Sequence, residues 1–199
     1  MAQRLAALLA MAGAAVGIYY ARRELNEPPD ATGAAVPLSR ERAPIGAAPD
    51  ARVLGLPDDP AWINDLSSWL PQAPRTTVGR LISYLWASPA TLGGLFVALL
   101  SGSRPTVRDG VLLFADLGGL PGWALRRSRF AATTLGHVVL AVDQPSPALL
   151  AHELAHTRQA ERFGPLMGPL YWYLLIRYGY TRHPLERAAR IAAREARQS

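Results

Sequence analysis

The chain contains no cysteine and no lysine. Without cysteine it forms no disulfide and offers no thiolate to a metal, so a zinc ion would need His, Asp or Glu ligands. All of its basic residues are arginines, and they are scattered along the chain without a nucleic-acid-binding motif. We therefore expect no nucleic-acid partner and interpret the net charge of +6 as a solvated basic surface that would also suit an anionic membrane.

The 199 residues are enough for one domain with additional segments. Residues 5–21 carry no charge and are flanked by arginines, which predicts a membrane anchor within residues 1–25; a cleaved signal peptide and a peripheral helix are the alternatives. The Pro- and Ala-rich residues 26–60 predict a linker, and residues 61–199 the folded domain. We thus expect a membrane-associated protein with a single-pass N-terminal anchor. Its sidedness stays open, because basic residues flank both ends of the anchor.

The folded domain is expected to be α+β. Residues 81–102 form a second uncharged run, which favours membrane association or a buried or interfacial helical hairpin. Residues 110–115 and 131–142 are apolar and β-branched and are separated by a Gly-Gly-Leu-Pro-Gly turn at 118–122. This pattern predicts a small antiparallel sheet.

The C-terminal part predicts three helices. Ser146 is a good N-cap and is followed by proline in the first turn, so a helix should run over residues 147–163 and end at Gly164. A second helix is expected over 166–176. The last begins at Pro184.

The first of these helices contains the pentapeptide His-Glu-Leu-Ala-His at positions 152–156. Residues four apart share one helix face, so His152 and His156 can bind a single ion. Glu153 lies beside them and could act as general base toward a water that zinc has acidified. Gln159 lies on nearly the same face and could fix the tautomer of an imidazole ring. The competing interpretation is two histidines that never bind metal.

A catalytic zinc site needs a third protein ligand. Glu161 points away from the histidine face, so it is excluded. Glu186, in the first turn of the last helix, is the predicted third ligand, although a glutamate there could equally stabilise the helix dipole. His183 and His137 are reserve ligands. His137 could also line the pocket or be a packed polar residue.

Several segments resemble an uncharacterised bacterial family with a zincin-type core, and the likeness covers residues 81–190. Where that family usually reads Asn-Pro-Phe-Glu, this chain has His183-Pro184-Leu185-Glu186, so the glutamate is kept and its flanking residues differ. More distantly, a His-Glu-x-x-His helix followed by a later glutamate is similar to gluzincin metallopeptidases. The resemblance implies a zincin-like fold and a zinc site more firmly than a substrate. The segments that carry it are 86–102, 135–140, 152–165 and 183–189.

The sequence thus predicts a membrane-associated, zinc-dependent metallopeptidase-like hydrolase. His152, His156 and Glu186 would bind Zn²⁺, and Glu153 would be catalytic. A peptide or protein substrate could pair with an edge strand near residues 135–139. The alternative is a non-catalytic zinc-binding or membrane scaffold protein, which would need a fourth protein ligand. A third role, contact with membrane headgroups, would use the arginine stripe of the last helix.

Overall fold

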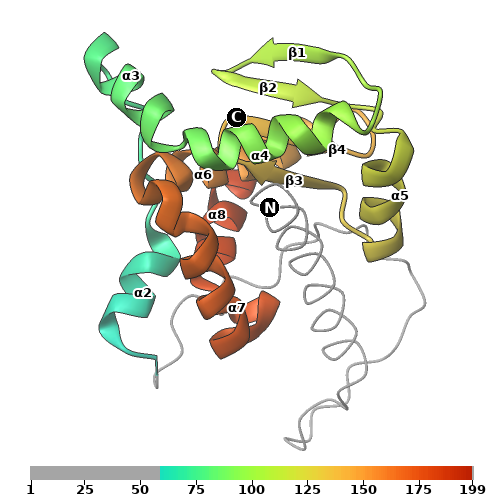
Figure 1. Cartoon of the computed structure of the whole chain (residues 1–199). Coiled ribbons are helices and arrows are strands. Elements are labelled where there is room, and N and C mark those ends of the chain that lie inside the picture. The colour runs from blue at the N-terminus through green and yellow to red at the C-terminus, as the bar shows by residue number, and fades with distance from the viewer. Residues whose placement is uncertain (1–58, 199) are drawn as a thin grey trace, which may run out of the picture.

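The computed structural model describes residues 59–198 and confirms an α+β fold (Figure 1). The predicted membrane anchor and most of the predicted linker lie outside these residues. The elements, in chain order, are α2 (Ala61–Ser68), α3 (Thr77–Trp86), α4 (Ser88–Leu99), β1 (Pro105–Arg108), β2 (Val111–Phe114), α5 (Gly119–Ser128), β3 (Ala132–Leu135), β4 (Val138–Ala141), α6 (Pro147–Phe163), the short 3-10 helix η2 (Gly164–Leu166), α7 (Met167–Arg182) and α8 (Pro184–Gln198).

The sheet is mixed, with strand order β1-β2-β4-β3, so the prediction of an antiparallel sheet is wrong for its central pair. Strands β2 and β4 are parallel, and Leu113 pairs with Val139. The segment predicted as a turn at 118–122 opens helix α5 instead, which carries the chain across before β3 begins. The predicted single strand at 131–142 is a hairpin of β3 and β4, reversed at Gly136, whose φ is +61°.

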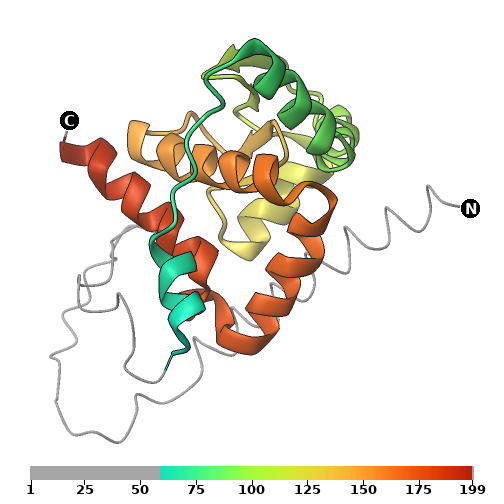
Figure 2. The ribbon, with the colours of Figure 1, turned by 90° about the vertical axis from the view of Figure 1, so that its left-hand side faces the viewer.

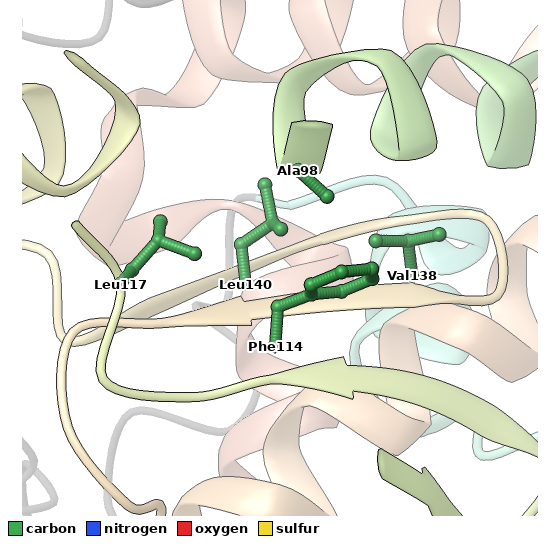
Figure 3. Close-up of a cluster of buried hydrophobic side chains, with 5 residues drawn as sticks. All are labelled: Ala98, Phe114, Leu117, Val138 and Leu140. Atoms are coloured by element: carbon green, nitrogen blue, oxygen red, sulfur yellow. The ribbon is translucent and has the colours of Figure 1, made fainter. Parts of the chain in front are cut away.

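Two helices cover the two faces of the sheet. On one face, Ala98 of α4 packs against Phe114, Val138 and Leu140, as Figure 3 shows. On the other face, Val111, Leu113 and Val139 are among the buried residues, with leucines of α6 packed against them. All four residues of β4 are buried, as expected for a strand covered on both sides. An edge strand was predicted near residues 135–139. Strand β3, which ends at Leu135, lies at the edge of the sheet, whereas β4, which contains residues 138 and 139, lies inside it.

Helix α6 has the predicted bounds, Pro147–Phe163. Ser146 Oγ accepts a hydrogen bond from the backbone N–H of Leu149, at 3.2 Å. The helix ends where Gly164 adopts a φ of +53°. A Cβ at Gly164 would lie about 2.4 Å from the indole nitrogen of Trp86, so the junction of α3 and α4 packs directly against the end of α6.

Helix α7 is longer than the predicted 166–176 segment, reaching Arg182 with a kink at Gly179 (φ 71°). Helix α8 begins at Pro184, as predicted. A third core cluster joins Ile63 of α2, Leu174 of α7 and Leu185 of α8. This cluster packs α8 against α2 and α7, and α8 also packs against α6; Figure 2 shows these helices together.

The uncharged run 81–102 falls mostly in two helices, α3 (Thr77–Trp86) and α4 (Ser88–Leu99), which are bent by 64° at their junction. Within residues 59–198, no single helix combines the length and apolar character needed to cross a membrane; α3 and α4 satisfy that test only when taken together.

Candidate metal centre

The fold brings His152, His156 and Glu186 together. The Nε2 atoms of the two histidines are 3.2 Å apart. Nε2 of His156 lies 3.2 Å from Oε1 of Glu186, and Nε2 of His152 lies 3.4 Å from Oε2. Ligand atoms bound to zinc at about 2.0–2.2 Å in a tetrahedron lie about 3.3 Å from one another. With one ligand atom taken from each residue, the three atoms lie within 4.8 Å of one another, so these side chains could hold one metal ion.

Each ligand is positioned by the helix that carries it. His152 and His156 are one turn apart on α6, and Glu186 is in the first turn of α8. The imidazole of His183 caps this turn, because its Nδ1 accepts the backbone N–H of Glu186 at 3.4 Å. The packing of α8 against α6 then brings the carboxylate to the two rings.

Gln159 orients the ring of His156. Its Nε2 donates to the carbonyl of Leu185 at 3.2 Å, which leaves Oε1 as the acceptor that lies 2.9 Å from Nδ1 of His156. This network assigns the ring proton of His156 to Nδ1 and a lone pair to Nε2. That is the tautomer in which Nε2 can bind a metal.

The cluster brings electron-rich atoms together, and this arrangement fits a cation. With its proton on Nδ1, His156 presents a lone pair to Oε1 of Glu186. Oε2 of Glu186 is buried and accepts no hydrogen bond among the described residues, although Nε2 of His152 lies 3.4 Å from it. Because a buried carboxylate oxygen that accepts no hydrogen bond is costly, a metal ion between these atoms would supply what the fold leaves unsatisfied.

In the metal-free chain a proton takes the place of that cation. Burial works against a charged imidazole, but the Glu186 carboxylate outweighs it and raises the pKa of His156 to about 9. Burial likewise opposes a charged Glu186, and the two histidines hold the pKa of that carboxyl well below its usual range. The site therefore favours positive charge beside Glu186.

Two tyrosines of α7 complete this environment. The hydroxyl of Tyr171 donates to Oε1 of Glu186 at 2.7 Å, and burial together with the Glu186 charge raises the pKa of Tyr171 well above its ordinary value. The Glu186 charge is the first cause of the raised pKa of Tyr180, followed by burial. Both phenols are thus protonated donors near neutral pH. Sequence reasoning missed them, because nothing in the local sequence shows that α7 folds back over the cluster.

Glu153 is buried on the same helix, beside the cluster. Its Oε2 accepts a hydrogen bond of 2.6 Å from the hydroxyl of Thr134 on the edge strand β3. Its charge contributes to the raised pKa of His156, which places the carboxylate within electrostatic reach of the histidines. Thr134 is a third residue that sequence reasoning missed, since its position depends on the packing of α6 on β3.

The two reserve histidines lie outside the cluster. Nε2 of His183 donates to the carbonyl of Tyr171 at 3.0 Å, and burial, the largest cause, lowers the pKa of His183 to about 4, so this ring is neutral. His137 lies 3.1 Å from Glu161, the carboxylate excluded by its helical angle, and stacks on the ring of Tyr84. His137 is thus a packed polar residue in this structure.

No protein-family model, curated protein or solved structure matches the chain. The resemblance to an uncharacterised bacterial family therefore stays a prediction. Fold and site together define an α+β protein with a buried His-His-Glu cluster that could hold a metal ion.

Proposed function

We propose that the chain is a membrane-associated, zinc-dependent hydrolase of the metallopeptidase type. The observation that carries the proposal is the position of the ligand groups, together with the carboxylate of Glu153 on the same helix. The two imidazole nitrogens are 3.2 Å apart, and each lies 3.2–3.4 Å from one of the two carboxylate oxygens of Glu186. Zinc suits two imidazoles and one carboxylate, and three protein ligands leave a coordination position open.

The chain's own residues have distinct tasks in this proposal. His152, His156 and Glu186 bind the ion, while Gln159 and Tyr171 hold two of these ligands in orientation. Bound zinc supplies a Lewis acid that lowers the pKa of water toward about 7. Glu153 would take a proton from the attacking water as general base and pass it to the leaving group.

A closed structural zinc site is the competing function, and it would need a fourth protein ligand. The reserve ligands His137 and His183 are engaged elsewhere, with Glu161 and with the backbone of α7 and α8. Because neither histidine is available as a fourth ligand, the catalytic function is favoured over the closed structural site.

A peptide substrate is supported by the place of Thr134. This residue holds Glu153 and belongs to β3, which lies at the edge of the sheet. An extended peptide that paired with β3 would pass close to the proposed general base. We also propose that the chain belongs to the uncharacterised bacterial family and is related to the gluzincin metallopeptidases.

The test is the zinc content of the purified full chain, in detergent where needed. We expect one zinc ion in the native chain and its loss in His156→Ala and Glu186→Gln. His183→Asn is the matched control, because asparagine is also a good helix cap and the ring is no ligand in the proposal; this variant should keep its zinc. A folded native chain that binds no zinc would refute the proposed function.

A second measurement separates binding from catalysis. In a screen of peptide and protein substrates, the native chain should be active and Glu153→Gln should be inactive while retaining zinc. Zinc retention with no activity in either chain across such substrates would favour the non-catalytic function.

A further inference from the structure

Helices α3 and α4 expose two stripes of large apolar side chains. On α3 the exposed residues follow the 3-4 spacing of one helix face, with Leu81 60% and Leu85 66% exposed. On α4, Leu92 is 64% and Leu99 79% exposed. Large apolar surfaces of this kind mark interaction sites. The α3–α4 surface, as it is called below, comprises Val78, Leu81, Ile82, Leu85, Leu92, Phe96 and Leu99.

The charged residues that flank this surface along the chain are all arginines. Residues 66–108 contain no aspartate or glutamate, whereas arginines occur at both ends of the apolar pair. Arg75 and Arg80 are exposed near the start of α3, and Arg104 is exposed just beyond α4. An apolar stripe with arginine at its margins complements a lipid surface, in which acyl chains meet anionic headgroups.

We propose that the α3–α4 surface docks onto an anionic lipid bilayer, with the apolar stripes in the interface and the flanking arginines on the headgroups. A second copy of the chain is a poorer occupant, because its own arginines would be brought against those of the first copy.

The docking surface is joined to the metal-binding helix. Trp86 Nε1, at the end of α3, donates to the carbonyl of Arg162 on α6 at 3.3 Å, and the hydroxyl of Tyr84 donates to the carbonyl of Gly110, in the turn between β1 and β2, at 2.9 Å. Through the first contact, docking of α3 would fix the orientation of α6 relative to the bilayer. The consequence for function rests on the proposed zinc hydrolase: a site held beside a membrane selects polypeptide segments close to that membrane.

The experiment uses the absence of cysteine, which allows a single labelling site in the full chain. Leu85→Cys and Phe96→Cys report on the surface, and Gln198→Cys is the control. Figure 2 shows α4 and the C-terminal end of α8 on opposite sides of the ribbon. Each variant carries an environment-sensitive fluorophore and is reconstituted in phosphatidylcholine vesicles with and without phosphatidylglycerol.

With phosphatidylglycerol present, the labels at 85 and 96 should shift to the blue, lose intensity to nitroxide lipids and be protected from aqueous iodide. The label at 198 should show none of these changes. Introducing Leu81→Glu and Ile82→Glu should abolish the blue shift at 96.

Labels at 85 and 96 that stay open to iodide and insensitive to nitroxide lipids would overturn the proposal. Protection by a cross-linkable second copy would also overturn it. Zinc content is measured on the same samples. Because the α3–α4 surface contains no metal ligand, a chain that binds zinc but does not dock would refute the docking proposal alone, whereas a folded chain without zinc would refute the proposed function.

Discussion

Helix α6 contributes to two buried groups of histidine and glutamate, and they differ in the source of their positive charge. In the ion-pair group, Glu161 is held by Arg158, three residues earlier on the same helix, and by His137. In the metal group, the partners of Glu186 are two imidazoles and the hydroxyl of Tyr171.

This difference determines which of the two buried carboxylates is available to bind a ligand. The arginine of the ion-pair group is permanently charged, so Glu161 is neutralised without any bound ion. The metal group depends on imidazoles, whose lone pairs can bind either a proton or a metal. The same two residue types therefore form a structural ion pair in one place and a candidate metal site in the other.

The largest effect should come from Glu153→Gln, which removes the proposed base and leaves both groups intact. We expect hydrolysis to fall by about 10²- to 10⁴-fold, because a positioned general base contributes that much. Substrate turnover and zinc content are measured on the same preparation. Glu161→Gln is the control, because Glu161 is on the same helix but in the ion-pair group; the folded fraction of this variant should keep its activity. Equal losses of activity in both variants would contradict the assignment of Glu153 as the base.

Removal of metal should destabilise only the chain that can bind it. An ion present at 100 times its dissociation constant adds about 2.7 kcal/mol, which corresponds to roughly 5–11 °C in Tm for a chain of this size. Thermal unfolding with and without a chelator measures the shift. The Tm of Glu186→Gln should not respond to chelator, and a response equal to that of the native chain would place the metal elsewhere.

Gln159→Leu should weaken metal binding while leaving all three ligands in place. Loss of the acceptor for Nδ1 removes the group that orients His156, and such partners are typically worth 10- to 100-fold in affinity. Competition with a chromogenic zinc chelator measures the change. An unaltered affinity would mean that the ring is held by packing alone.

Arg158→Met should destabilise the fold without touching zinc. Its loss leaves Glu161 with His137 as a partner, and a buried carboxylate that loses one partner costs about 1–3 kcal/mol. Urea unfolding of the native and variant chains, both saturated with zinc, gives this difference. A loss of zinc in Arg158→Met would show that the two groups are not independent.

Most of the metal group was predictable from the sequence because His152, His156 and Gln159 lie within one helix, whose ends are also marked in the sequence. Helical spacing places His152, His156 and Gln159 on one face, and Ser146 with Gly164 delimits the helix. The position of the third ligand is not local information, since Glu186 reaches the histidines only through the packing of α8 on α6.

The sheet was harder to predict. Helix α5 begins with Gly119 and contains Pro121 and Gly122, residues that usually indicate a turn, so the parallel pairing of β2 with β4 was hidden. Thr134 and Tyr171 were missed for a related reason. Hydroxyl groups far apart in sequence meet Glu153 and Glu186 only when the tertiary structure forms.

The contact of Asp59 with α8 has a mechanical consequence. Its carboxylate pairs with Arg182 at 3.1 Å and with Arg187 at 3.4 Å, and Arg187 follows Glu186 directly in the chain. A pull on the polypeptide ahead of residue 59 would be transmitted through these two bonds to the turn that presents Glu186. For the same reason, a truncated protein starting at residue 61 would remove this brace, and a fragment intended to keep the start of α8 in place should include Asp59.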